Sequence, residues 1–435
     1  MSNSITSYQP YKVTQPKWSS HAVIYQVNTR QFSKEGKFSG VTKQLPRIKS
    51  LGADIVWLMP IHPIGEVERK GELGSPYAVK DYMQINPEFG TADDLKRLIQ
   101  TAHDLSMKVI IDWVPNHSAW DNWLVEEHPE WYARDYKGDF RPSPWWDWSD
   151  IIEFDYTQVG LRNYMIEAMC YWVKEFDIDG FRHDVAGYVP NDFWQQARCE
   201  LDAIKPVFML AEWENRDMHE RAFNMTYAWT WNETMHEIAM GKCSLDSLRK
   251  YYSWNERSWP REAYRMTFVS NHDKNAWDGT QHEQFGDALE GCIVLSVIGE
   301  GMPLIHNGQE AGESKRLAFF ERDPIEWQEH EIGDLYRKLI ALKKSKTVLG
   351  NGEYGAKMIQ VPNSRMSQVF SFIRHDSSEK VFVVINFSNT ATETRFTEPL
   401  FEGEYIDWST GESFSFHTGT TLAVAPWQYK IFIGC

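Results

Sequence analysis

Short apolar runs alternate along the first 345 residues with longer segments whose apolar positions follow a helical period. The eight runs are residues 22–27, 55–59, 108–112, 180–182, 207–210, 223–225, 265–269 and 303–305. Between the second and third runs, Thr91 and Asp94 predict a capping box ahead of an amphipathic helix. Eight strand candidates with helical connections predict an α/β fold, a closed (β/α)8 barrel. A doubly wound sheet is the alternative, but no glycine-rich phosphate fingerprint follows the first run.

Two segments depart from this alternation. Residues 118–152 have no clean helical period and carry six tryptophans, which predicts a short irregular excursion over one mouth of the barrel. After a last helix near residues 331–342, β-branched and aromatic runs separated by turn residues predict an antiparallel β-sandwich domain. The predicted division is therefore a barrel over 1–117 and 153–345, the excursion over 118–152, and a C-terminal β domain over 346–435.

The composition excludes some classes of binding partner. Asp and Glu number 61 against 45 Lys and Arg, a net charge of −16, and no basic run is present. Such a chain repels phosphate backbones, so neither nucleic acid nor an anionic membrane is an expected partner. No apolar stretch reaches the roughly 18 residues that a membrane span needs. The 20 tryptophans suggest rings displayed in a cleft, and the five cysteines, without a CxxC pair, are expected to be free and mostly buried thiols.

The first ten residues, MSNSITSYQP, lack the basic and apolar regions of a signal peptide. The compartment stays open between a cytoplasmic location for the chain as given and a periplasmic or secreted one if a signal was removed. The oligomeric state is likewise open.

Polar residues cluster where four of the predicted strands end. The third run leads into DWVPNH (112–117), the fourth into GFRHD (180–184), the fifth into AEWE (211–214) and the seventh into SNHD (270–273). In a barrel of this kind the reactive groups lie at the carboxyl ends of the strands. The groups expected to converge there are Asp184, Glu212, Asp273, Arg182, His117 and His272.

Like charges placed together raise each other's pKa, so a cluster of carboxyl groups indicates chemistry that needs two of them in opposite protonation states. Glycosidic bond cleavage is such a reaction, in which one carboxylate attacks the anomeric carbon and a second carboxylic acid protonates the leaving oxygen. Asp184 and Glu212 end neighbouring strands, which lie about 5 Å apart. Arg182 points to the same side as Asp184 and is expected to hold it ionised.

These motifs give the sequence a specific resemblance. DWVPNH, GFRHDVAG, AEW and VSNHD resemble, in order, the four signature regions of the α-amylase family, glycoside hydrolase family 13. The early segments LMPIHP and SPYAVKDY and the late GQE are also similar to that family. The matches extend from about Tyr25 to Glu310, and the β domain fits the family's C-terminal domain.

The resemblance implies a retaining α-glucan hydrolase that cleaves α-1,4 bonds in starch, maltooligosaccharides or cyclodextrins. It implies Asp184 as nucleophile, Glu212 as general acid/base and Asp273 as transition-state stabiliser. The remaining implied residues are substrate contacts at Tyr77, His117, Arg182, His272 and Trp213, with Asp112 and Asn116 in support.

No cofactor is needed for this chemistry, but in many relatives the residue at Asn116 binds a structural calcium ion. Asp147 or Asp150 would then join it, although a full cage is not evident from the sequence. A further departure follows the nucleophile, where the family often has Lys-His and this chain has Gly187 and Tyr188. Recognition on the leaving-group side is therefore left open.

Several alternatives stay open. Glu214 also follows the fifth run and competes with Glu212 as the acid, whereas His183 is expected to be a filler and Glu310 to close a turn. An α-glucan transglycosylase or isomerase would use the same residues, because only the acceptor differs. A non-catalytic glucan-binding protein is the third hypothesis, and the presence of all three carboxylates disfavours it.

Overall fold

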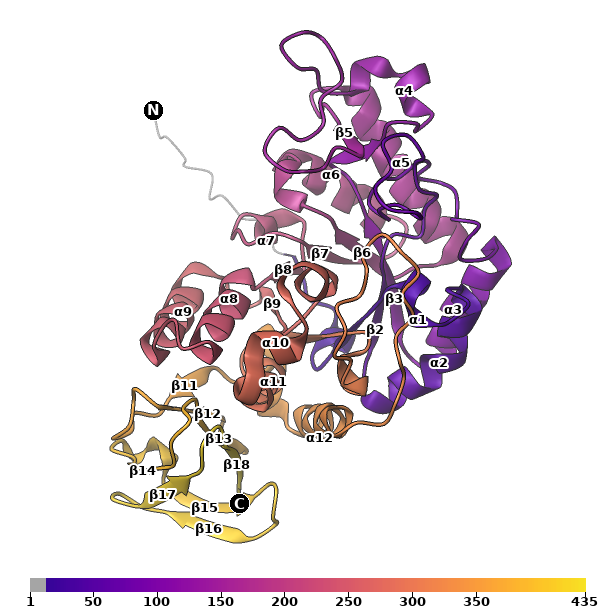
Figure 1. Ribbon diagram of the computed structural model, residues 1–435. Coiled ribbons are helices and arrows are strands. Elements are labelled where there is room, and N and C mark those ends of the chain that lie inside the picture. Colours follow the sequence, from indigo (N-terminus) through magenta and orange to yellow (C-terminus); the bar gives the residue numbers. More distant parts are fainter. Residues whose placement is uncertain (1–12) are drawn as a thin grey trace, which may run out of the picture.

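In the computed structural model, which describes residues 13–435, eight parallel strands close into a barrel (Figure 1). Around the barrel the strands follow the order β1-β10-β9-β8-β7-β6-β3-β2. Their bounds are β1 (Ile24–Val27), β2 (Ile55–Leu58), β3 (Lys108–Trp113), β6 (Gly180–His183), β7 (Phe208–Ala211), β8 (Met225–Tyr227), β9 (Tyr264–Thr267) and β10 (Met302–His306). The predicted (β/α)8 barrel is confirmed, with each strand lying at or within two residues of its predicted run.

Helices cover the outside of the barrel. The longer ones are α2 (Phe38–Leu51), α3 (Ala92–Asp104), α5 (Val159–Phe176), α6 (Asn191–Asp202), α8 (Trp229–Ala239), α9 (Leu245–Ser258), α11 (Leu289–Ile298) and α12 (Glu331–Ser345). Short helices α1 (Thr29–Phe32), α7 (Met218–Arg221) and α10 (Gln281–Phe285) lie in the connections. The capping box expected ahead of α3 is present, because the Thr91 side chain accepts from the Asp94 N–H and the Asp94 carboxylate accepts from the Thr91 N–H.

Alternate strand residues point into the barrel and toward the helices, so the strands are buried on both faces and read as continuous apolar runs. The inward layer includes Ile24, Trp57, Ile110, Leu210, Tyr227, Met266 and Leu304. Arg182 on β6 is a charged exception within the barrel and is fully buried. Below it, Gly180 has φ +154°, and a Cβ there would lie 1.9 Å from the Phe208 carbonyl oxygen. A glycine at this position therefore lets β6 approach β7 closely.

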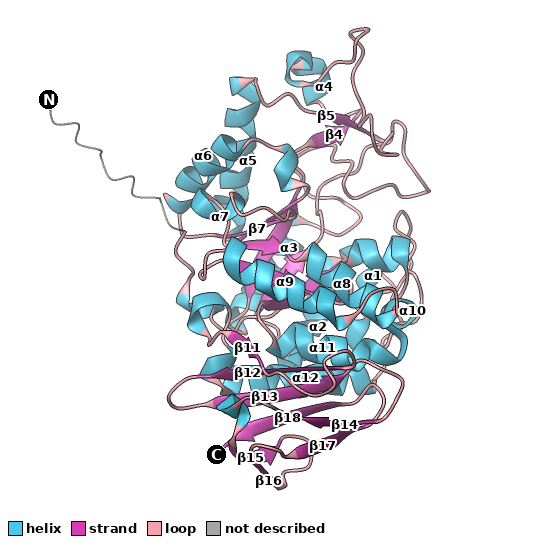
Figure 2. Ribbon diagram, turned by 90° about the vertical axis from the view of Figure 1, so that its left-hand side faces the viewer, coloured by secondary structure: helices cyan, strands magenta, loops and turns pink. Residues whose placement is uncertain are grey.

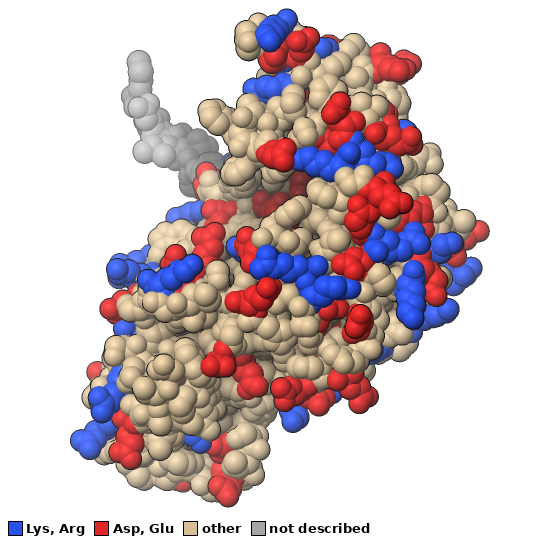
Figure 3. Space-filling model, viewed as in Figure 1, with Lys and Arg blue, Asp and Glu red and all other residues tan. Residues whose placement is uncertain are grey.

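The irregular segment forms a small lobe above the barrel, seen at the upper end of Figure 2. Strands β4 (His117–Ala119) and β5 (Ile151–Glu153) pair at its base, and α4 (Leu124–Glu127) lies above them. The tryptophans divide between two environments: Trp131 is buried in the lobe, whereas Trp145 and Trp146 are exposed. Figure 3 shows a hollow beneath this lobe with acidic atoms inside it.

The C-terminal domain is an antiparallel sheet of order β11-β12-β13-β18-β15-β16, accompanied by the two-stranded ribbon β14-β17. The strands are β11 (Met358–Gln360), β12 (Val369–His375), β13 (Lys380–Asn386), β14 (Thr392–Arg395), β15 (Gly403–Asp407), β16 (Ser413–Phe416), β17 (Thr421–Val424) and β18 (Tyr429–Gly434). An aromatic core around Phe382, Phe416 and Phe432 fills the space between them. The predicted all-β character of this domain is confirmed.

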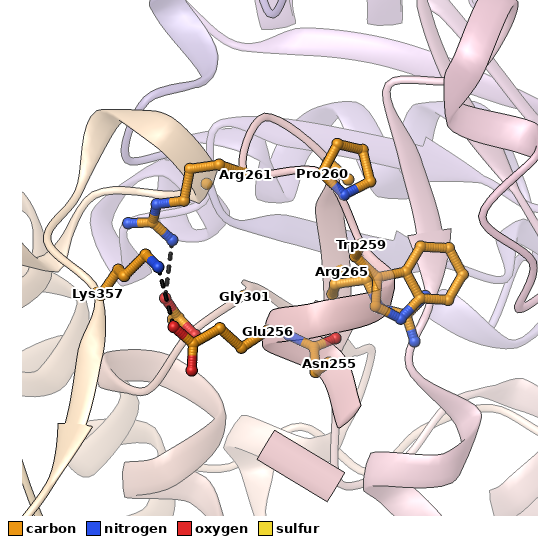
Figure 4. Close-up of a pocket in the computed structure, with 11 residues that line it drawn as sticks. Asn255, Glu256, Trp259, Pro260, Arg261, Arg265, Gly301 and Lys357 are labelled. Atoms are coloured by element: carbon orange, nitrogen blue, oxygen red, sulfur yellow. Dashed lines mark hydrogen bonds and ion pairs between the residues drawn. The ribbon is translucent and has the colours of Figure 1, made fainter. Parts of the chain in front are cut away.

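Helix α11 and buried cations join the two domains. All residues of this helix except Glu290 are buried, and a Cβ at Gly291 would lie 2.9 Å from Ile385 of the β domain. Arg374 of β12 donates to the carbonyl of Gly299, just after α11, at 2.7 Å. Figure 4 shows a polar pocket at this junction, crossed by the Arg261–Glu300 contact of 2.7 Å and the Lys357–Glu256 contact of 2.9 Å.

Two further expectations concern membrane-spanning helices and the cysteines. Over residues 13–435, no helix combines the length and apolar character needed to cross a membrane. The cysteines are free, as expected, but the expectation that they are mostly buried is wrong: Cys292 is buried, whereas Cys199 and Cys435 are exposed. Cys199 lies near the C-terminal end of the amphipathic helix α6, on the face that points to solvent.

Candidate active site

The carboxyl ends of the barrel strands open into a cleft of about 710 Å³ beneath the excursion. Asp184, Glu212 and Asp273, which follow β6, β7 and β9, line it together. Two backbone bonds continue the barrel ladder into the site: Asp184 N–H donates to Trp113 at 2.8 Å and Glu212 N–H to His183 at 2.9 Å. The three predicted carboxylates are thus brought to one cavity by rigid strand ends.

Arg182 lies at the centre of the acidic cluster. Its Nη1 donates to Asp112 Oδ1 and to Asp184 Oδ1, both at 2.8 Å, and its Nη2 lies 2.8 Å from Glu212 Oε1. Its Nε donates to the Tyr227 hydroxyl at 3.1 Å. The carboxylates of Asp184 and Glu212 therefore contact neighbouring nitrogens of one guanidinium, which holds both at the same end of the barrel.

Burial gives Glu212 its distinct character. Its side chain is largely buried, and this desolvation raises the pKa of Glu212 well above the usual value, with Arg182 opposing the shift and Asp184 adding to it. Its second oxygen accepts from the Val185 N–H at 2.8 Å. Glu212 is therefore suited to keep its proton above the usual pH range of a glutamic acid, while Asp184 accepts a charge-assisted hydrogen bond from Arg182.

A hydrogen-bonded chain fixes the opposite side of the site. Gln26 Nε2 donates to His272 Nδ1 at 2.7 Å, which leaves the proton of the neutral ring on Nε2. That Nε2 lies 2.8 Å from the Tyr77 hydroxyl, which donates in turn to Asp112 Oδ2 at 3.1 Å. Burial lowers the pKa of His272 well below its usual value, so the ring stays neutral. The chain orients Tyr77 and His272 without adding charge.

The other predicted residues occupy distinct positions. His117 lines the cleft, and burial lowers its pKa. Asn116 lies beside it, with its amide nitrogen 3.2 Å from His117 Nδ1. Trp213 is half-buried and packs on Tyr188 at 5.2 Å between ring centres, behind the surface that lines the cleft.

The competing residues lie away from the reaction centre. Glu214 accepts from the Thr230 N–H at 2.9 Å and from Arg265, so its carboxylate is held outside the cleft. His183 is buried among aromatic rings with neither nitrogen bonded. Glu310 is bound by Tyr25 and by Arg47, the latter at 2.8 Å, and does not line the cleft.

Some residues that line the cleft lie outside the sequence motifs. An aromatic wall of Trp277, Phe319 and Phe320 faces the cleft from the connections after β9 and β10. Phe319 stacks on Tyr77 with ring centres 6.2 Å apart. The adjacent phenylalanines in a segment without helical period were the available signal. Gln26 carries no such signal, because an inward strand residue is indistinguishable from core until the barrel is closed.

A lysine contacts the two carboxylates that could join Asn116 around a calcium ion. The Lys70 ammonium contacts the Asp147 carboxylate at 3.3 Å and that of Asp150 at 3.8 Å, and it bonds the Asp147 carbonyl. The two carboxylates expected to join Asn116 thus already have a cation. Within residues 13–435, no group of three or more His, Cys, Asp or Glu is arranged to hold a metal ion.

A parallel barrel with two neighbouring carboxyl groups at the carboxyl ends of its strands is the arrangement expected of a barrel glycosidase. The family model of the α-amylase catalytic domain matches residues 19–153 and 147–347, and that of the α-amylase C-terminal all-β domain matches residues 362–430. The chain therefore belongs to the α-amylase family, as its four signature regions indicated.

Relatives with solved structures cover almost the whole chain. A maltogenic α-amylase, AmyB from Thermotoga neapolitana, is 33% identical with a TM-score of 0.87 and covers 95% of this chain and 98% of its own. An α-amylase from Lactobacillus plantarum is 31% identical with a TM-score of 0.85, over 95% and 99%. The α-amylase MalA of Haloarcula japonica is 25% identical over 89% of this chain, which spans 58% of that longer protein.

Proposed function

We propose that this protein is a retaining α-glucan hydrolase that cleaves α-1,4-glucosidic bonds by double displacement. The observation that carries the proposal is the shared contact of Asp184 and Glu212 with Arg182 at the floor of one cleft. Membership of the α-amylase family supports it. The names of relatives, which include maltogenic α-amylase and cyclomaltodextrinase, support maltooligosaccharides and cyclodextrins as substrates beside starch.

In the first step, an Asp184 oxygen forms a bond to the anomeric carbon while the bond from that carbon to the leaving oxygen breaks. Glu212 transfers its proton to the leaving oxygen, which departs as a free hydroxyl group. Arg182 holds the Asp184 carboxylate in place. Asp273 stabilises the positive charge that develops on the sugar ring, and Tyr77 and His272 contact the same sugar.

In the second step, water attacks the anomeric carbon of the glycosyl-enzyme. Glu212, now a carboxylate, removes a proton from that water, and the bond to Asp184 breaks. The two inversions retain the configuration of the sugar, and the step returns each carboxyl group to its starting protonation state.

Two substitutions test the assignment. Asp184→Ala and Glu212→Gln are each expected to lower kcat on maltooligosaccharides by at least about 10³-fold, since each removes a group that acts in the transition state. Glu130→Gln, on an exposed side chain of the excursion, is the matched control and is expected to keep full activity. Near-normal hydrolysis by either active-site variant would overturn the proposal.

A transglycosylase is the second candidate, because an acceptor hydroxyl can replace water in the second step. One relative, an α-1,4-glucan:maltose-1-phosphate maltosyltransferase of Picrophilus torridus, is 24% identical over 90% of this chain. Longer products at high maltooligosaccharide concentration would favour transfer over hydrolysis.

We also propose that the reaction uses protein groups alone and that Lys70 holds Asp147 and Asp150 in place of a structural calcium ion. The support is the position of its ammonium group between the two carboxylates. This cation ties the segment after β2 to the excursion.

A further inference from the structure

Trp57 of β2 lies inside the barrel, one layer below the acidic cluster. It pairs in register with Ile110 of β3, and Asp112 follows two residues further toward the carboxyl end of that strand. Because alternate strand residues share a face, Ile110 and Asp112 both point into the barrel. Trp57 is fully buried and does not line the cleft, so it can act on the site only through its neighbours.

The indole contacts three residues of the site. Its Nε1 donates to Asp112 Oδ2 at 3.1 Å. The guanidinium carbon of Arg182 lies 5.1 Å from the ring centre, within the range of a cation–π attraction. The ring of His272 meets the indole edge-on, with ring centres 5.9 Å apart. Trp57 is thus bonded to the site as well as packed beneath it.

The direction of the hydrogen bonds at Asp112 follows from the chemistry of the donors. An indole N–H and a guanidinium can only donate, so Asp112 Oδ1 faces the obligate donor Arg182 and Oδ2 faces the obligate donor Trp57. Tyr77 also contacts Oδ2, at 3.1 Å, but a hydroxyl group can accept as well as donate. Without the indole N–H, Oδ2 could therefore hold a proton that points to Tyr77.

The surroundings of Asp112 make this distinction important. Burial raises the pKa of Asp112, the charge of Arg182 opposes the rise, and the nearby Asp184 adds to it. Donors to a carboxylate favour its ionised form. The other titratable groups reach Asp112 through Arg182 or Tyr77, and they are Glu212, Tyr227, His272 and Asp273.

The charge on Asp112 matters to the proposed nucleophile. Arg182 Nη1 is shared between Asp112 Oδ1 and Asp184 Oδ1, at 2.8 Å from each. A neutral Asp112 would lose its charge-assisted bond to Arg182, so the guanidinium would no longer be held on that side. The orientation of Asp184 depends in turn on that guanidinium.

We propose that Trp57 is a positioning residue whose indole N–H keeps Asp112 ionised and thereby fixes Arg182 and the nucleophile Asp184. The inference rests on the proposed function. It adds a residue outside the cleft that acts on the ionisation of the site and makes no contact with sugar.

Trp57→Phe tests the inference, because it keeps an aromatic ring and removes the N–H. We expect kcat on maltotetraose at pH 6 to fall about tenfold, with KM within about twofold of the parent. Activity should also be lost at a higher pH on acidification, so the acid limb of kcat/KM should move upward by about one pH unit. The pH profile of initial rates measures this shift.

A matched control separates this effect from the loss of core volume. Trp231 of α8 is also fully buried, lies away from the cleft and donates from Nε1 to the Tyr252 hydroxyl at 3.0 Å. Trp231→Phe therefore loses the same atoms and one hydrogen bond. It should lower the melting temperature but leave the acid limb in place.

A second measurement covers the case that Trp57→Phe does not fold, as judged by its thermal melt. In the parent protein labelled with ¹⁵N-tryptophan, the indole N–H signal that is displaced in Asp112→Asn should titrate with the midpoint of the acid limb. The reason is that protonation of Asp112 removes the charged acceptor of this N–H.

A parent-like kcat in Trp57→Phe, a lower kcat with an unmoved acid limb, or an indole signal that does not titrate would each overturn the inference. Failure of the proposed function looks different, since the parent protein itself would then not hydrolyse maltotetraose at any pH.

Discussion

The floor of the cleft and its rim differ in how they are held. The floor consists of buried, mutually bonded charges, namely Asp112, Arg182, Asp184 and Glu212. The rim consists of half-buried or exposed rings, namely Trp146, Trp277, Phe319 and Phe320. Buried charges depend on one another, so a change to one disturbs the rest, whereas exposed rings act more independently. The chemistry is therefore fixed rigidly while sugar recognition stays open to variation.

The largest effect on the floor of the cleft is expected from a substitution at Arg182. We expect Arg182→Ala to lower kcat by about 10³-fold or more, since three buried carboxylates lose their common cation. The melting temperature should also fall. Arg337→Ala, which removes an exposed pair with Asp334 on α12, is the control and should change neither quantity appreciably. A near-normal kcat in Arg182→Ala would show that the charged residues of the floor do not depend on one another.

The pH profile sharpens the contrast between proton donor and nucleophile. Because burial raises the pKa of Glu212, its protonated form persists above the usual glutamic acid range and is lost as the pH rises through that pKa. The kcat/KM for maltotetraose should decline on that alkaline limb. The kcat/KM for α-maltosyl fluoride should lack it, because fluoride needs no protonation. The same alkaline decline on both substrates would contradict the assignment of Glu212 as the acid.

The same shift has a consequence for stability. A carboxyl group whose pKa is raised by folding favours the folded state below the unfolded pKa, and this advantage disappears as the pH rises through the folded pKa. Glu212→Gln should therefore raise the melting temperature at pH 8 relative to the parent, with less gain at pH 4. Melting curves at the two pH values measure this difference, and an equal gain at both would exclude this cause.

A smaller effect is expected behind the floor, at Gln26. Gln26→Leu removes the donor that fixes the proton of His272, so we expect about a tenfold loss of kcat/KM. Gln26→Glu provides the comparison, because its carboxylate can accept from the ring nitrogen but cannot donate to it. Full activity of both variants would mean that the ring orientation does not depend on this contact.

The smallest effect is expected at Lys70, which contacts Asp147 and Asp150 of the excursion. Lys70→Met should lower the melting temperature by only a few degrees, in line with a partly exposed ion pair of about 1 kcal/mol. Chelation by EDTA should leave the melting temperature of the parent unchanged. A drop on chelation that calcium reverses would show that the excursion holds a metal ion and would overturn the role given to Lys70.

The floor could be predicted because its residues stand at strand ends in short motifs whose order is recognisable. Asp184 and Glu212 needed only the (β/α)8 topology to be brought together. Gln26 and Tyr227 could not be predicted, since they are inward positions whose partners lie across the barrel. The need for glycine at position 187 was equally hidden, because it arises from the Trp213 ring, which would lie 2.0 Å from a Cβ there. The functional roles of the motif residues remain predictions until the variants are measured.

Helix α11 packs against both the barrel and the β domain, and Arg374 of the β domain donates a hydrogen bond to the Gly299 carbonyl at its C-terminal end. If heat unfolded either domain, the apolar side chains of α11 that pack on that domain would become exposed to water, which is unfavourable. The protein should consequently melt in a single cooperative transition, and the amino-terminal 357 residues alone should be insoluble.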